Sequence, residues 1–419
     1  MLHATSQTGK GLPVFHGTAR SALFALFALP GILFLLVTLS VLADMRADPQ
    51  QVRGFAAPMV HGEHVIATGT DNAGEVGEGG EAGGGTPVGA PMRHEDIVVH
   101  AAFSPDGKYV VTASHDGTAC VWKADSGEPV REPMRHDGGV EHAAFSADGT
   151  RVVTAGDITA RIWRADSGEP VGDPMRHDEH VWYAAFNPDG THVVTASHDG
   201  SAQVWEADSG KAVGAPMLTG PVFHAQFSPD GTHVVTAGMT LNARLWKVGE
   251  EEPVGEPMRH DGDIWRAEFN PDGKHLVTAS SDGTARLWKA DSGEPVGKPM
   301  RHDEQVWYAA FSPDGTHVVT ASSDGTARLW KADSGEPVGK PMRHDGDVWR
   351  AAFSPDGRHV ITASSDGTAR LWKADSGEPA GEPIRHDKSV SYAAFSPDGT
   401  RVVTASRDGT ARVWKVESK

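Results

Sequence analysis

Cysteine is nearly absent from this chain, because Cys120 is the one cysteine among 419 residues. A single thiol excludes an internal disulfide framework and a zinc site built from several cysteines. Basic residues are also scarce relative to acidic ones, with 38 Lys and Arg against 56 Asp and Glu and a formal net charge of −18. Because phosphate backbones repel an acidic surface, we expect no direct binding of nucleic acid.

Long hydrophobic runs are missing except for one near the amino terminus, at residues 21–43 (SALFALFALPGILFLLVTLSVLA). A helix over this uncharged run would be ~34 Å long, which is enough to cross a ~30 Å hydrocarbon core. Lys10 and Arg20 precede the run, so the bias of positive charge places residues 1–20 in the cytoplasm and the rest of the chain outside. The lipid bilayer is therefore an expected partner through residues 21–43.

Two other interpretations of this run stay open. Val41 and Ala43 satisfy the small-residue rule for a secretory signal cleaved after Ala43, which would make the rest of the chain a secreted protein, although the run is longer than a usual signal core. A cytoplasmic location of the repeats is the third interpretation. In each case we expect residues 44–86 to form a stalk and a Gly/Glu-rich linker, with a decayed partial repeat at residues 57–72.

From residue 87 onward, one sequence unit recurs eight times, and residues 302–343 match residues 344–385 at 34 of 42 positions. One tryptophan marks each unit, at spacings of 41 or 42 residues: Trp122, Trp163, Trp205, Trp246, Trp288, Trp330, Trp372 and Trp414. Each unit reads as an edge strand such as PVGKPM and three longer strands such as VWRAAF, HVITAS and ARLWKA, with SPDG and SDGT turns between the longer ones. One such sheet cannot bury both faces, so neighbouring sheets must stack and the array must close.

Seven of the eight units also carry a His after the edge strand, a Thr, an Asp in the second turn and the marker Trp. In units one and seven these residues stand at identical separations: His94, Thr112, Asp116 and Trp122, and His344, Thr362, Asp366 and Trp372. Unit two keeps the set, with Asp157 in the Asp position, despite a one-residue deletion. Unit four departs from it, with Thr219 and Gly220 where His belongs and Thr240 where Asp belongs, so we expect its blade to be the softest.

This pattern resembles the WD-repeat β-propeller family over residues 87–419. The resemblance implies that the four residues form a buried hydrogen-bond relay, in which His pairs with the buried Asp and Thr links His to the indole. We therefore expect an all-β fold, a single eight-bladed β-propeller of four-stranded blades, preceded by one transmembrane helix. Residues 87–92 should pair with the last unit and close the ring. A seven-bladed ring with one displaced unit is the alternative.

No residue set in the sequence indicates catalysis. A catalytic triad occurs once and beside an exposed nucleophile, whereas the His, Thr and Asp of the relay recur in seven units. The histidines that open the second long strand, such as His317 and His359, come one per blade and are too far apart to share an ion. The chain also lacks a phosphate-binding glycine motif. We expect no catalytic residue, no metal and no cofactor.

The family resemblance indicates where a partner would bind. In the family, the residue five positions after the relay His points to the face on which partners dock, and the corresponding positions here, with unit four aligned by its following strand, are Val99, Glu141, Trp182, Phe223, Trp265, Trp307, Trp349 and Ser391. Two residues before four of these positions stand His180, Asp263, Gln305 and Asp347. Aromatic side chains beside carboxylates favour a peptide that carries Arg or Lys. The alternative is that duplicated units copied a tryptophan that packs on its own blade.

These observations predict a membrane-anchored, non-catalytic scaffold with an extracytoplasmic propeller that recognises a protein or peptide. The residues expected to contact the partner are Trp182, Phe223, Trp265, Trp307, Trp349, Asp263, Asp347 and His180. The alternative function is a sensory module that binds a small ligand or glycan at the mouth of the propeller channel. Such a module would need convergent polar groups in one pocket.

Overall fold

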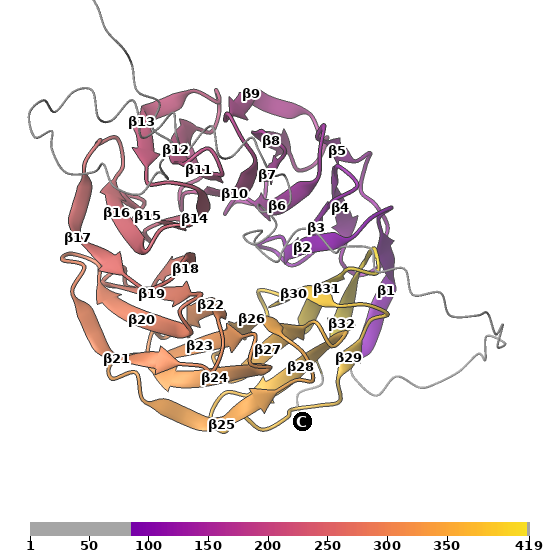
Figure 1. Ribbon diagram of the computed structural model, residues 1–419. Coiled ribbons are helices and arrows are strands. Elements are labelled where there is room, and N and C mark those ends of the chain that lie inside the picture. The colour runs from indigo at the N-terminus through magenta and orange to yellow at the C-terminus, as the bar shows by residue number, and fades with distance from the viewer. Residues whose placement is uncertain (1–84, 417–419) are drawn as a thin grey trace, which may run out of the picture. The chain divides into compact units, whose positions relative to one another are not determined.

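The computed structural model describes residues 85–416. Within them, thirty-two strands build eight four-stranded antiparallel sheets around one central axis (Figure 1). The predicted all-β propeller with eight four-stranded blades is confirmed, and the seven-bladed alternative is wrong. None of these residues belongs to a helix long and apolar enough to cross a bilayer. The predicted membrane span at residues 21–43 and most of the stalk and linker, up to residue 84, lie outside the described residues.

The strands of each blade follow one another from the axis outward, and we number the blades 1 to 8 after the sequence units. The innermost strands are β2 (Val98–Phe103), β6 (Val140–Phe145), β10 (Val181–Phe186), β14 (Val222–Phe227), β18 (Ile264–Phe269), β22 (Val306–Phe311), β26 (Val348–Phe353) and β30 (Val390–Phe395). The second strands are β3 (Tyr109–Ser114), β7 (Arg151–Gly156), β11 (His192–Ser197), β15 (His233–Gly238), β19 (His275–Ser280), β23 (His317–Ser322), β27 (His359–Ser364) and β31 (Arg401–Ser406).

The outer half of each blade is built in the same way. The third strands are β4 (Thr118–Lys123), β8 (Thr159–Arg164), β12 (Ser201–Glu206), β16 (Asn242–Lys247), β20 (Thr284–Lys289), β24 (Thr326–Lys331), β28 (Thr368–Lys373) and β32 (Thr410–Lys415). The outermost strands of blades 1 to 7 are β5 (Met134–Arg135), β9 (Pro170–Arg176), β13 (Ala212–Leu218), β17 (Pro253–Arg259), β21 (Pro295–Arg301), β25 (Pro337–Arg343) and β29 (Ile384–Arg385). Blade 8 takes its outermost strand from the start of the described chain, β1 (Thr86–Arg93).

The hydrophobic core lies between neighbouring blades. The second strand β27 (HVITAS) is buried at every position after its first residue, because adjacent blades cover both of its faces. Between blades 6 and 7, Leu329 and Met342 pack in one cluster with Val360 and Trp372. Burial of such side chains stabilises the fold by ~1.5–3 kcal/mol each. The stacking of blades therefore supplies the core that a single sheet lacks.

Every inner strand begins with the same irregularity. In β10, Val181 pairs with Ser197 and Tyr183 pairs with Ala196, so Trp182 is an extra residue in a β-bulge. The register shifts at the same place in the other seven inner strands. A bulge breaks the strict alternation of side chains between the two faces of a strand. As a consequence, the second and third residues of an inner strand can lie on one side of it, as in blade 3, where Trp182 contacts Phe223 and Tyr183 contacts His224 of the next inner strand.

The relay has the geometry that the resemblance implies. In blade 7, the Trp372 indole Nε1 donates to the Thr362 hydroxyl at 2.8 Å, and His344 Nε2 lies 2.7 Å from the same hydroxyl. His344 Nδ1 lies 2.9 Å from Asp366 Oδ2. An indole can only donate and a carboxylate can only accept, so Trp372 donates to Thr362 and the Nδ1 proton of His344 points to Asp366. Burial raises the pKa of Asp366, but hydrogen bonds from His344 and Thr368 outweigh it and keep the carboxyl ionised.

Blade 2 lacks the complete relay, although its sequence predicts all four residues, with Asp157 in the Asp position. His136 still contacts Thr154 at 2.7 Å, but within the described chain no hydrogen bond joins His136 to Asp157. The deleted residue shortens the turn, because Gly156 pairs directly with Thr159 and leaves Asp157 in a two-residue turn with φ 50°. The carboxylate is thereby displaced from its relay position. Among residues 85–416 the full four-residue relay is present in six blades: 1, 3, 5, 6, 7 and 8.

Candidate functional site

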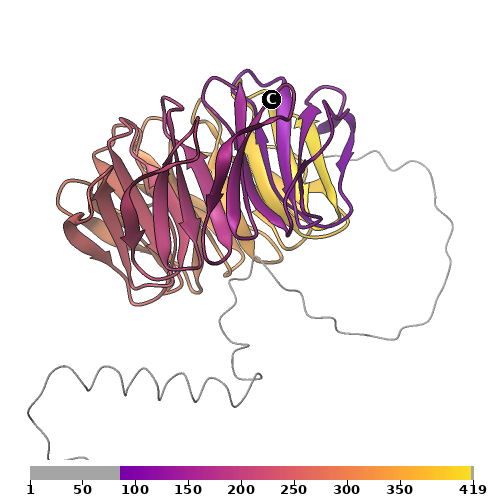
Figure 2. The same cartoon turned by 90° about the horizontal axis from the view of Figure 1, so that it is seen from above.

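A central channel runs along the axis of the ring. The inner strands begin beside the relay histidines at one end of this channel, here called the upper mouth, and end in the SPDG-type turns at the other end, the lower mouth. Figure 2 shows the strands of the blades running between these two faces of the ring. The side chains of the inner strands line the channel in layers, and each layer takes one residue from every blade.

The upper layer contains a continuous run of five aromatic side chains on blades 3 to 7, here called the upper arc: Trp182, Phe223, Trp265, Trp307 and Trp349. Successive ring centroids lie 6.0, 5.2, 5.0 and 5.4 Å apart. All five side chains are half-buried. Aromatic rings at these separations attract one another, so each member of the arc supports its neighbours while one side stays open to solvent.

The indole nitrogens of the upper arc differ in their hydrogen bonding. Trp307 Nε1 donates to Ser323 Oγ at 2.7 Å. The nitrogens of Trp182 and Trp265 are buried and have no hydrogen-bond partner among the described residues. A buried donor without an acceptor raises the free energy of the folded protein by about 1–3 kcal/mol.

Two carboxylates stand beside the arc. Asp263 and Asp347 are half-buried, and neither forms an ion pair with any residue in the described part of the chain. Burial raises the pKa of Asp263, and burial together with the charge of Glu304 raises the pKa of Asp347. Each carboxylate would therefore be stabilised by a positive charge brought close to it.

The other upper-layer positions do not continue the arc. Val99 and Glu141 are buried, and Ser391 is half-buried. Glu141 lies 3.2 Å from His115 and 3.3 Å from His180, two contacts that sequence reasoning missed. His180 was predicted to contact a partner, and the structure places it against Glu141 and, at 4.4 Å between ring centroids, against Trp182.

Below the upper arc the channel holds a second layer, here called the middle ring. It consists of the third residues of the eight inner strands: His100, His142, Tyr183, His224, Arg266, Tyr308, Arg350 and Tyr392. Aromatic neighbours in this ring lie 4.2 to 4.5 Å apart, and the guanidinium groups stack on tyrosine rings at 3.9 to 4.5 Å. The ring lines the channel between the two mouths with stacked planar groups.

The charge state of the middle ring follows from its burial. Burial lowers the pKa of His142 to about 3 and the pKa values of His100 and His224 well below the usual range, with help from nearby positive charges. The three histidines are therefore neutral at physiological pH. Arg266 is paired with Glu268 two positions along the same strand. Sequence reasoning missed this layer, although a signal existed, because the third position of the inner strand varies among otherwise similar units.

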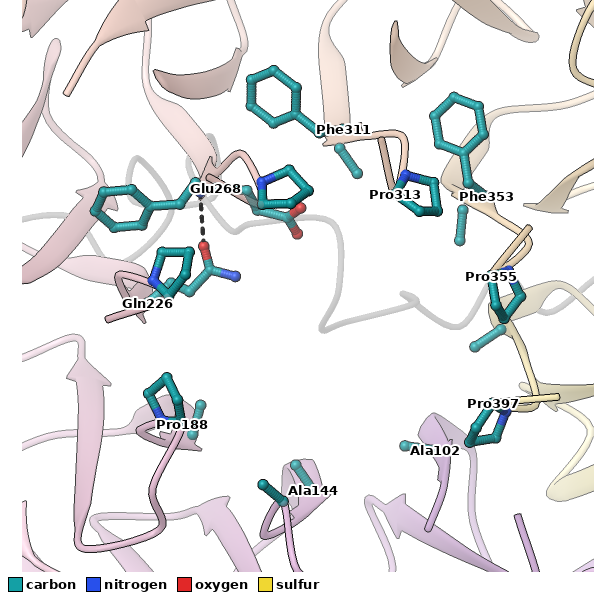
Figure 3. A pocket seen from close by; sticks show the side chains of 18 of the residues that line it. Ala102, Ala144, Pro188, Gln226, Glu268, Phe311, Pro313, Phe353, Pro355 and Pro397 are labelled. Carbon is teal, nitrogen blue, oxygen red and sulfur yellow. Dashed lines mark hydrogen bonds between the residues drawn. The ribbon is translucent and has the colours of Figure 1, made fainter. Parts of the chain in front are cut away.

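The lower mouth opens into a cavity of about 810 Å³ (Figure 3). Alanine and phenylalanine side chains at the ends of the inner strands, together with turn prolines, form most of its wall. Tyr183 of the middle ring also lines this cavity. On blades 4 and 5 the wall is interrupted by Gln226 and Glu268, in positions that hold alanine in the other six blades. The cavity is therefore apolar with one polar side.

The described residues also bear on catalysis and metal binding. No three His, Cys, Asp or Glu side chains within residues 85–416 are arranged to hold a metal ion. Cys120 is buried, and burial raises the pKa of its thiol to about 11, so it is protonated at physiological pH and a poor nucleophile. The relay residues are buried between blades, where they hold the blades in register.

Comparison with known proteins gives two family models that match the chain. The model described as IFT122 first beta-propeller matches residues 139–415, and the model described as WD domain, G-beta repeat matches residues 85–123. No curated protein matches the chain.

Solved structures with a similar fold include two that compare with this chain as follows. The computationally designed Ika8 protein is 23% identical with a TM-score of 0.69, over 79% of this chain and all of that chain. The C-terminal WD40 domain of Sif2 is 20% identical with a TM-score of 0.68, over 80% of this chain and all of that chain. At these identities the likeness concerns the fold alone.

Proposed function

The chain belongs to the WD-repeat β-propeller family, and from this premise we propose that it is a membrane-anchored scaffold that holds a basic protein or peptide at the upper mouth of its channel. Propellers of this family generally bind proteins or peptides and generally do not catalyse reactions.

The observation that carries the proposal is the upper arc together with its two carboxylates. Five half-buried aromatic side chains form one continuous surface, and aromatic residues dominate the energetics of protein interfaces. Asp263 and Asp347 flank this surface without an ion pair to any described residue. An Arg or Lys side chain can stack on an indole and pair with a carboxylate at once.

The loops around the arc add to this preference for a basic partner. Asp261, Asp303, Glu304 and Asp345 lie exposed in the loops that lead into the inner strands of blades 5 to 7. Exposed carboxylates attract a basic partner over a distance of about a Debye length. Binding should therefore weaken as the salt concentration rises.

The test is a binding measurement on the full-length chain with two matched libraries of nine-residue peptides, one rich in Arg and Lys and one rich in Asp and Glu. We expect the basic library to yield binders. Changing both Trp265→Ala and Trp349→Ala should weaken them by roughly 2 kcal/mol or more for each side chain. The matched control is Tyr109→Ala, which removes an aromatic side chain that is 38% exposed and lies outside the arc. Equal binding by the double variant and the control would refute the proposal.

The membrane anchor is a separate part of the proposal and rests on the uncharged run at residues 21–43 with Lys10 and Arg20 before it. A reporter that is active only outside the cytoplasm, fused after Lys419, should give a signal. Retention of the chain in carbonate-washed membranes distinguishes an anchor from a signal cleaved after Ala43. Activity of a cytoplasm-only reporter at the same position would show the opposite orientation.

A further inference from the structure

The lower cavity has a polar side that the repeats do not explain. The fifth residue of the inner strand is alanine in six blades: Ala102, Ala144, Ala185, Ala310, Ala352 and Ala394. Only blades 4 and 5 of the described ring replace it, with Gln226 and Glu268, and these two blades are neighbours. Two adjacent polar replacements that face one cavity, at a position that holds alanine in the other six blades, indicate a local role.

Two other polar replacements near this cavity have a structural explanation. Asn187 and Asn270 stand where the other turns have serine. The Oδ1 atom of each accepts the backbone N–H that the serine hydroxyl accepts elsewhere, at 2.9 Å in both cases. These asparagines therefore maintain the turn, and Gln226 and Glu268 are the candidates for ligand binding.

Gln226 and Glu268 each keep one hydrogen-bonding end free for the cavity. Gln226 Oε1 accepts the backbone N–H of Phe269 at 3.0 Å, which fixes the orientation of the amide and leaves its NH₂ group without a partner in the described chain. Glu268 Oε1 accepts from Arg266 and from the Tyr308 hydroxyl, whereas its Oε2 has no hydrogen bond to any residue from 85 to 416. Figure 3 shows both side chains turned toward the cavity. The result is a donor beside an acceptor.

The channel above this pair holds another polar side chain without a hydrogen-bond partner among the described residues. His224 lies two residues before Gln226 on β14, so both face the channel. Its side chain is only 2% exposed, and neither ring nitrogen has a hydrogen-bond partner among the described residues. Arg266 and Glu268 neutralise each other on the next blade. The polar side of the cavity is therefore close to neutral, and it would disfavour a ligand that carries a full charge.

We propose that the lower cavity binds a neutral, flat ligand with an amide-type edge, in which an N–H group stands beside a carbonyl oxygen. The Gln226 NH₂ group donates to the ligand carbonyl, and Glu268 Oε2 accepts from the ligand N–H. The apolar body of the ligand packs against the alanine and phenylalanine wall of the cavity. A cavity of about 810 Å³ with apolar walls and a few convergent polar groups has the usual features of a small-molecule site.

The probe for this proposal is 2-quinolone, a flat lactam, and its matched control is N-methyl-2-quinolone, which lacks the N–H. Calorimetric titration of the full-length chain should give saturable binding of 2-quinolone and at least about tenfold weaker binding of the methylated analogue. Gln226→Ala should weaken 2-quinolone binding by about tenfold. This variant is expected to fold, because six blades carry alanine at the same position.

Two further variants test whether binding needs the Gln226 donor beside the Glu268 acceptor, or only polar groups anywhere on the cavity wall. Arg266→Tyr with Glu268→Ala copies the sequence of blade 6 at these positions and should abolish the difference between the two quinolones. Gln226→Ala with Ala394→Gln moves the amide to blade 8, on the opposite wall, and should not restore binding. The proposal is overturned if 2-quinolone does not bind saturably, if both quinolones bind equally to the parent chain, or if the relocated amide restores binding.

Discussion

Pro87 lies opposite Trp414 where β1 pairs with β32. The first described strand thus completes the blade that contains the last three strands, and hydrogen bonds between distant parts of the chain close the ring. A second link also joins the two ends of the ring: Arg401 Nη2 of blade 8 donates to the Gly107 carbonyl of blade 1 at 2.7 Å. Closure removes the sheet edges that an open array would expose.

Removal of β1 should open the ring. A chain that lacks residues 1–84 keeps β1 and should unfold in one cooperative thermal transition as a monomer. A chain that lacks residues 1–95 loses β1, exposes the outer edge of β32, and should unfold at a lower temperature and self-associate. Thermal denaturation followed by circular dichroism, together with light scattering, checks both chains. Equal stability of the two would show that closure does not depend on β1.

Tryptophans of the relay and of the upper arc should differ in their contribution to folding. Trp288 is 4% exposed and lies in the core cluster between blades 4 and 5, so Trp288→Ala should lower the free energy of unfolding by roughly 3–5 kcal/mol. Trp265 is half-buried at the channel mouth, so Trp265→Ala should lower the free energy of unfolding clearly less than Trp288→Ala does. Chemical denaturation of both variants measures the difference. Similar losses for the two would mean that the arc serves mainly to pack the blades.

The pair of Glu141 and His115 should make stability depend on pH. Burial raises the pKa of Glu141, but hydrogen bonds from His115 and His180 outweigh it and lower the pKa to about 2. The contribution of the Glu141 carboxylate to the free energy of unfolding is therefore complete above pH 4.5 and is lost as the pH falls toward 2. Burial lowers the pKa of His115, but its hydrogen bond and charge interaction with Glu141 outweigh burial and raise the pKa above 6.5. The contribution of protonated His115 to the free energy of unfolding is therefore complete below pH 6.5 and is lost as the pH rises further. The pair therefore stabilises most between about pH 4.5 and 6.5.

Glu141→Gln should thus reduce the free energy of unfolding most at about pH 5–6 and less at pH 8 or pH 3. Denaturant titrations across this range measure the gap between parent and variant. The control is Glu132→Gln, which makes the same change at an exposed carboxylate and should give a smaller gap. A gap for Glu141→Gln that stays constant with pH would contradict the ion pair.

Blade 4 should be the least protected part of the ring. Trp246 Nε1 still donates to Thr236 at 3.0 Å, but Thr219 and Thr240 cannot supply the His and Asp of the relay. Amides of β15 and β16 should therefore exchange with solvent faster than those of β27 and β28 in blade 7, where the relay is complete. Hydrogen exchange with mass spectrometry compares the two blades within one sample. Equal protection would show that inter-blade packing alone holds blade 4.

Much of this fold could be predicted because its information is local and repeated. The spacing of Trp122, Trp163 and their counterparts set the number of units, and the turns between apolar runs set four strands per unit. Apolar residues on both faces of these strands require stacking, and stacking requires closure. The relay could be anticipated for the same reason, since His, Thr, Asp and Trp recur at constant separations.

The channel was decided by the tertiary structure. The bulge at Trp182 turns both Trp182 and Tyr183 toward the axis, which simple alternation along a strand would not predict. Arg350 contacts Tyr392 of the next blade, and Gln226 and Glu268 line one cavity from neighbouring blades. Their distances depend on the radius of the closed ring and on the register of each inner strand. In the turn of blade 2, the loss of one residue displaced Asp157 while the spacing pattern stayed recognisable. The sequence determines which side chains each blade presents, and ring closure determines which of them meet.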